Sequence, residues 1–222
     1  MHKNNPPDSV NQGRKLIYIP ILHTQDDMGS FSELIREATL EKHGEKFWDQ
    51  KVDLINEIWA EINQKVKELD FKCEKTRLYQ DGLPVCDREL ELVTEIAKTG
   101  SLNHLLLIRL LERGAILMGT ECAELLVEEY NLVKKIMAAG NIEEAGKIEA
   151  SQKALSDNLL KKRDQYIAER INNTLGAGET GILFLGMLHS LENLLDNDIL
   201  VTYPLFKPYK MMTKGKSRDL EK

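Results

Sequence analysis

The sequence contains no apolar run of the ~18 to 20 residues that a membrane-spanning helix requires. Its N-terminal stretch, MHKNNPPDSVNQGRK, is polar and lacks the apolar core of a secretory signal peptide. Only three cysteines are present (Cys73, Cys86 and Cys122), and no two of them form a Cys-x-x-Cys motif. An odd cysteine count without a signal peptide favours a reducing compartment, so we expect a cytoplasmic protein without a membrane partner.

Two motifs that define common enzyme classes are also absent. The phosphate-loop motif Gly-x-x-x-x-Gly-Lys-Ser/Thr does not occur, and neither does the Gly-x-Ser-x-Gly elbow of serine hydrolases. The formal net charge is −6, whereas a general nucleic-acid binder needs a basic face for the phosphates. We therefore expect no nucleic-acid partner.

The sequence has enough hydrophobic residues, 42% of the total, to form one core. We expect a flexible arm over 1–13, a single domain over 14–206 and a loose basic tail over 207–222. Short apolar runs that suit buried strands alternate with stretches of helical periodicity, which predicts an α/β fold. Its mainly parallel sheet has about five strands, flanked by helices, and the predicted strands fall near 15–22, 75–80, 115–119, 182–185 and 198–203.

Capping residues place the helices between these strands. The stretch from Ser30 to Glu33 reads as a capping box that starts a helix ending near Gly44, and Ser101 starts another. Ser190 is a good N-cap for a short helix over 191–195. Residues 121–176 are predicted to be mostly helical, with a break near Asn141, and they form a long insertion before the penultimate strand.

The chemistry-bearing residues follow the predicted strands. His23, Asp81, Glu121 and His189 each come after a different strand. Because parallel strands end at one edge of a sheet, we expect these four side chains to converge there. Imidazole and carboxylate groups suit a divalent metal, and without a metal a histidine can act as a base that a carboxylate orients. The alternatives are that Asp81 only forms a turn and that Glu121 only begins a helix.

Three further segments are Pro20-Ile21-Leu22-His23, Arg163-Asp164-Gln165-Tyr166-Ile167 and Gly186-Met187-Leu188-His189. Together they resemble the superfamily that groups TraB/PrgY proteins, Tiki metalloproteases, ChaN-like haem-binding proteins and erythromycin esterase-like proteins. Gly186-Met187-Leu188-His189 matches the later of two Gly-x-x-His motifs typical of these proteins. Pro20-Ile21-Leu22-His23 stands at the place of the earlier motif but has proline for glycine. Arg163-Asp164-Gln165-Tyr166-Ile167 resembles the arginine segment between them. By itself, the Arg163–Asp164 pair would be interpreted as a solvated helix face.

The resemblance implies a hydrolase that acts on a small-molecule or peptide substrate by cleaving a peptide or ester bond. His23, His189 and Glu121 would bind a divalent transition metal (Mn, Zn, Co or Fe), or a histidine would activate water without metal. Either Glu121 or Asp81 would be the working acid, and Arg163 would stabilise negative charge on a carbonyl or phosphoryl oxygen.

The same resemblance includes ligand binders. The alternative prediction is therefore a non-catalytic ligand-binding or signalling protein on the same scaffold. Segment 121–176 is also a candidate homodimer face, because one side of it carries an apolar stripe of Leu125, Leu126, Tyr130, Val133 and Ile136.

Overall fold

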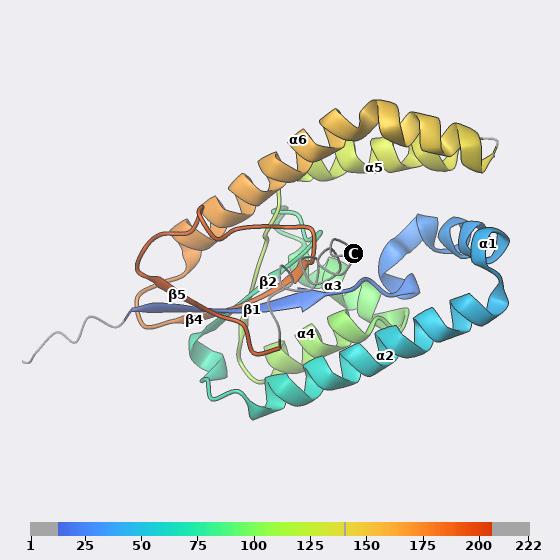
Figure 1. The fold of residues 1–222 in the computed structure, drawn as a ribbon. Coiled ribbons are helices and arrows are strands. Elements are labelled where there is room, and N and C mark those ends of the chain that lie inside the picture. Colours follow the sequence, from blue (N-terminus) through green and yellow to red (C-terminus); the bar gives the residue numbers. More distant parts are fainter. Residues whose placement is uncertain (1–12, 140, 206–222) are drawn as a thin grey trace, which may run out of the picture.

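A computed structural model of the chain describes residues 13–139 and 141–205 (Figure 1). The predicted tail, and all of the predicted arm except Gly13, lie outside the described residues. The strands are β1 (Arg14–Ile21), β2 (Thr76–Gln80), β3 (Ile116–Met118), β4 (Thr180–Gly186) and β5 (Ile199–Thr202). The helices are η1 (Gln25–Phe31), α1 (Ser32–His43), α2 (Glu45–Glu68), η2 (Cys73–Lys75), α3 (Glu89–Lys98), α4 (Leu102–Glu112), α5 (Ala123–Met137) and α6 (Ile142–Thr174), of which η1 and η2 are 3₁₀ helices.

The five strands form one sheet in the order β3-β2-β4-β1-β5, and all its pairs are parallel. The predicted α/β fold is therefore confirmed. β4 lies at the centre of the sheet, and its residues 181–185 are all buried. A strand covered on both faces needs apolar side chains in both directions, which explains its continuous run of Ile, Leu and Phe.

Helices cover both faces of the sheet, and the alternation of side chains along β1 shows which helices cover which face. Ile17, Ile19 and Ile21 pack with buried residues of α2, α3 and α4. Leu16 and Tyr18 point the other way and pack with α6. Figure 1 shows α5 and α6 on one side of the sheet and α2 and α4 on the other. The result is a three-layer α/β/α domain.

The predicted helical insertion is present as the hairpin of α5 and α6, which precedes β4. Asn141 accepts a hydrogen bond from the backbone N–H of Glu144 at 2.9 Å and so caps α6, as its position in the sequence predicts. Among residues 13–139 and 141–205, none of the helices has both the length and the apolar character that crossing a bilayer demands.

Two predicted helix starts are wrong. The predicted capping box does not begin α1, because the chain first forms η1, whose own box is made by Thr24 and Asp27, and Phe31 occupies the N-cap position of α1. The segment 191–195 forms turns instead of a helix. A helix of five residues forms too few hydrogen bonds to offset the free-energy cost of nucleation. In addition, the backbone N–H of Ser190 binds the Asp164 carboxylate.

Candidate functional site

The carboxyl edge of the sheet brings the predicted site residues together. His23 follows β1, Asp81 follows β2, and Glu121 follows β3. His189 comes from the turn after β4, where its backbone N–H donates to the carbonyl oxygen of Gly186 at 3.2 Å. Arg163 reaches the same edge from α6, so all five predicted residues belong to one connected set of contacts.

Arg163 is the hub of a buried ion-pair network. Its Nε and one terminal nitrogen donate to Glu121 at 2.6 and 2.7 Å. That same nitrogen donates to Asp81 at 2.9 Å, and the other terminal nitrogen donates to both carboxylate oxygens of Glu129 at 2.6 and 2.7 Å. These five bonds match the five N–H groups of a guanidinium. Because its donors are used within the protein, Arg163 positions the acids and is not placed to stabilise a substrate oxyanion, contrary to its predicted role.

Glu121 is completely buried, and both of its carboxylate oxygens are engaged. Oε1 also accepts the backbone N–H of Gly82 at 2.7 Å. Burial and the neighbouring Asp81 raise the pKa of Glu121, and the hydrogen bonds from Arg163 oppose that rise. Glu121 therefore ties the turn after β2 to α6.

Asp81 joins the two predicted histidines. Its Oδ2 accepts the backbone N–H of Gly186 at 2.8 Å and lies 3.3 Å from His23 Nε2, and its Oδ1 lies 3.8 Å from His189 Nε2. Burial tends to raise the pKa of Asp81, but the hydrogen bond from His23 and the charge of Arg163 hold it well below its usual range. In turn, burial opposes the charging of His23, yet Asp81 raises the pKa of that imidazole.

His189 forms a second histidine–carboxylate pair. Its Nδ1 lies 2.6 Å from Oδ1 of Asp164, while Oδ2 of Asp164 accepts the backbone N–H of Ser190 at 3.1 Å. An ionised carboxylate only accepts hydrogen bonds, so Nδ1 is the donor in this pair, and Nε2 is the ring nitrogen left to exchange a proton. This Nε2 is directed toward Asp81. The pair has the geometry in which a carboxylate orients a histidine base.

A third polar cluster holds the loop that carries His23. The Asp27 carboxylate accepts the backbone N–H of Thr24 at 2.7 Å and binds Ser101, whose Oγ lies 2.7 Å from Nδ1 of His104. These residues are the types of a Ser-His-Asp triad, but Ser101 is fully buried and caps α4. The cluster therefore anchors η1 to α4 and fixes the position of His23.

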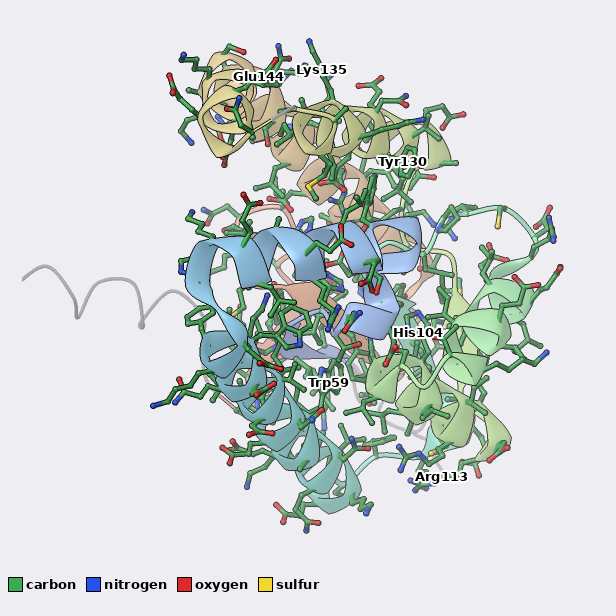
Figure 2. All side chains as sticks on the ribbon, turned by 90° about the vertical axis from the view of Figure 1, so that its right-hand side faces the viewer. Trp59, His104, Arg113, Tyr130, Lys135 and Glu144 are labelled. Carbon is green, nitrogen blue, oxygen red and sulfur yellow. The ribbon has the colours of Figure 1, made fainter. Side chains whose placement is uncertain are left out.

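An open pocket of about 570 Å³ lies over these groups. Its polar floor includes His23, Asp81, Arg163 and His189. Figure 2 shows Tyr130 on the side of α5 that faces α1, and Lys135 on the opposite side. The Tyr130 ring lies 4.8 Å from that of Phe31, measured between centroids. The apolar walls come from the carboxyl ends of β1 and β4 and from helical residues on either side. They are Ile21, Leu22, Phe31, Ile35, Leu126, Tyr130, Val133, Leu160, Met187 and Leu188.

The predicted metal set does not fit this geometry. Of His23, His189 and Glu121, the glutamate has both oxygens bound to Arg163 and Gly82. The acid that lies between the two histidines is Asp81. Within the described part of the chain, no group of three or more His, Cys, Asp or Glu side chains has an arrangement that could hold a metal ion.

Two acids of the site were not among the predicted site residues. Asp164 was interpreted as part of a solvated pair, yet only 7% of it is exposed. Glu129 interrupts the apolar stripe of Leu126, Tyr130 and Val133 on α5, and an acid within such a stripe is the signal that could have found it. Both positions depend on how α5 and α6 cross the sheet edge.

One glycine-rich stretch does not contribute to the site. Residues 176–181 read Gly-Ala-Gly-Glu-Thr-Gly, which has the spacing of a dinucleotide-binding fingerprint. That fingerprint follows a strand and opens a helix, whereas this stretch follows α6 and leads into the amino end of β4. It lies at the opposite end of β4 from His189.

Comparisons of the chain with protein-family models, with curated proteins and with solved structures find no match. The superfamily resemblance therefore rests on the three sequence segments alone, and it stays a prediction.

Proposed function

We propose that the chain is a hydrolase that cleaves an ester or peptide bond by histidine-based activation of water. The observation that carries this proposal is the Asp164–His189 pair, in which a largely buried carboxylate holds Nδ1 at 2.6 Å and leaves Nε2 at the floor of a pocket. Asp81 and His23 form a second pair beside it. Two histidines with separate carboxylate partners suit a division between base and electrostatic stabiliser.

In the proposed reaction, His189 Nε2 removes a proton from water as the water oxygen attacks the substrate carbonyl carbon. The imidazolium that forms lies between Asp164 and Asp81, which both stabilise its charge. The raised pKa of His23 favours its cationic form, which stabilises the negative charge on the carbonyl oxygen. The carbon–oxygen or carbon–nitrogen bond then breaks, and His189 returns its proton to the leaving alkoxide or amine.

The test is hydrolysis of 4-nitrophenyl butyrate and of N-acetylphenylalanine 4-nitroanilide, one ester and one amide probe. We expect kcat/KM to fall at least about 100-fold in His189→Ala and about 10-fold or more in Asp164→Asn. His43→Ala is the matched control, because His43 is exposed at the end of α1 and its ring packs against Phe47, away from the pocket residues. Wild-type rates in His189→Ala would contradict the proposal.

The same assay tests whether the proposed reaction depends on a divalent transition metal. Elemental analysis of the purified protein and activity after chelation would decide between the metal-dependent and metal-free forms of the proposal. Activity that survives chelation supports the metal-free base. About one transition ion per chain, lost together with activity, supports a metal-dependent enzyme whose carboxylate ligand is Asp81 instead of Glu121, given the contacts of Glu121.

The second candidate is a non-catalytic ligand-binding protein. It is favoured by the apolar walls of the pocket and by the use of all five Arg163 donors within the protein. Binding without turnover of either probe would support this candidate over the hydrolase.

A homodimer through residues 121–176 also remains a proposal. Leu126, Tyr130 and Val133 of the predicted stripe line the pocket, so a partner would contact the outer face of the hairpin. Val127 and Leu155 are 57% and 50% exposed and are the apolar residues available for this contact. Light scattering after gel filtration tests the oligomeric state, and a monomer at micromolar concentration would contradict the dimer.

A further inference from the structure

The pocket over the histidine pairs combines apolar walls with an excess of acidic groups. Ten of the residues that line it are apolar. Six of them come from α1 and its preceding turn and from α5 and α6, and the other four come from the carboxyl ends of β1 and β4. Small-molecule sites are commonly pockets of this size range with mainly apolar walls and a few polar groups at one place. A ligand that fills the space must therefore present an apolar body to these walls.

The charges at the floor are unbalanced. Asp81, Glu121 and Glu129 share the single guanidinium of Arg163, and Asp164 holds His189. With Asp27, five carboxyl groups stand here against three basic side chains, Arg163, His23 and His189, so the acidic groups are in excess even if both imidazoles are counted as cations. Arg163 is the only lysine or arginine among the described lining residues.

Glu129 is the acidic group of this set that a ligand in the pocket can reach. The Glu129 side chain is 40% exposed, whereas those of Asp81 and Glu121 are 5% and 1% exposed. Glu129 lies on the same face of α5 as the wall residues Leu126 and Val133, which are three and four residues from it, and it precedes Tyr130 directly. An acidic group thus stands within the apolar wall, between the floor and the solvent.

We infer that the ligand of this pocket is an apolar molecule with a cationic group, such as an arylalkylamine or its ester or amide derivatives, and that anionic molecules are rejected. The inference names the substrate class of the proposed hydrolase and in that respect rests on the proposed function. The cation would lie near Glu129, and the apolar body would lie between α1 and α5. A negative potential in a pocket with apolar, low-dielectric walls favours cations and disfavours anions of the same shape.

The test compares three ligands that share one skeleton and differ in charge, namely 4-phenylbutylamine, 4-phenylbutanamide and 4-phenylbutanoate. Their dissociation constants are measured by calorimetry at about pH 8, where the amine is cationic and the carboxylate is anionic. We expect the amine to bind at least about 10-fold more tightly than the carboxylate, with the amide between them. Equal or tighter binding of the carboxylate would overturn the inference.

Three variants locate the binding site. Val133→Ser should weaken the binding of all three ligands several-fold. Val127→Ser, the same change on the outer face of the same helix, should leave their dissociation constants unchanged. Glu129→Gln should reduce the preference for the amine. No effect of Val133→Ser on binding would contradict the assignment of the site, and a change of oligomeric state in Val133→Ser would identify a second copy of the chain as the occupant instead.

Binding is also measured in His189→Ala, which separates this inference from the proposed function. If the amine binds selectively but neither probe is hydrolysed, the ligand class stands and the hydrolase fails. If the probes are hydrolysed but charge has no effect on binding, the hydrolase stands and the ligand class fails.

Discussion

Gly186 has no side chain because Asp81 occupies the space beside it. A Cβ built on Gly186 would lie 2.8 Å from Asp81 Oδ2, 3.7 Å from His189 Cδ2 and 3.8 Å from His23 Nε2. A methyl group here would displace the carboxylate that connects the two histidines. The close approach of Asp81 thus explains why the Gly-x-x-His segment begins with glycine in this structure.

Gly186→Ala should therefore abolish the proposed hydrolysis and lower the free energy of unfolding by about 1–3 kcal/mol, because the buried Asp81 must move. Gly146→Ala is the matched control. Gly146 is exposed within α6, where an added Cβ meets no atom within 4 Å, and the change should stabilise the protein by about 0.5–1 kcal/mol. Urea denaturation measures both. Wild-type activity in Gly186→Ala would contradict the geometry described for Asp81.

The His23–Asp81 pair should make stability depend on pH in a defined direction. The pKa of His23 is raised from 6.5, so its stabilising effect is complete below pH 6.5 and is lost as the pH rises through the raised value. The pKa of Asp81 is lowered from 3.8, so its effect is present above pH 3.8 and is lost as the pH falls through the lowered value.

The difference in stability between wild type and His23→Gln should thus be largest between pH 3.8 and 6.5 and should shrink above that interval. Since the His23 side chain is 36% exposed, we expect a difference of no more than about 1 kcal/mol. Urea denaturation at a series of pH values measures it. A difference that grows as the pH rises above 6.5 would contradict the assigned partner.

At the scale of elements, α1 differs from the other helices that flank the sheet. None of its residues is buried, whereas five residues of α4 are buried. Glycines with positive φ stand before and after it, Gly29 at 52° and Gly44 at 80°. Its preceding turn contacts α5 through the rings of Phe31 and Tyr130. A helix with so little buried surface is held in place by little packing energy.

Amide hydrogen exchange should therefore be at least about 10-fold faster in α1 than in α4. Saturation with 4-phenylbutylamine should slow the exchange of α1, because Phe31 and Ile35 line the pocket, and should leave that of α4 unchanged. Equal protection of the two helices without ligand would show that α1 is held by contacts stronger than those described.

The elements also show what the sequence could predict. The four strand ends were placed together from chain order alone, because parallel strands share one edge and apolar runs mark buried strands. Asp164 and Glu129 required knowledge of how α5 and α6 pass over that edge, which no local pattern contains. The helix predicted after β4 does not form, because Ser190, a good N-cap residue by sequence, binds its tertiary partner Asp164 through its backbone N–H.

At the scale of the whole molecule, the Arg163 network joins β2, β3, α5 and α6. Arg163→Met should lower the free energy of unfolding by about 3–5 kcal/mol, since Glu121 and Asp81 would remain buried without their cationic partner. Arg88→Met is the matched control. Arg88 pairs only with the exposed Glu91 among its salt bridges in the described residues, so its loss should leave stability within experimental error. Thermal and urea unfolding measure both variants. A loss of stability in Arg163→Met no larger than that in Arg88→Met would contradict the structural role of the network.

The central claim is that Asp164 holds His189 with Nδ1 protonated and Nε2 free to accept a proton from water. Nitrogen-15 NMR of the histidine rings at about pH 8 tests this directly, because the chemical shifts distinguish a protonated from an unprotonated ring nitrogen. The account predicts the Nδ1–H form for His189, and its loss or mixing with the other tautomer in Asp164→Asn. An Nε2–H form in the wild-type protein would contradict the account.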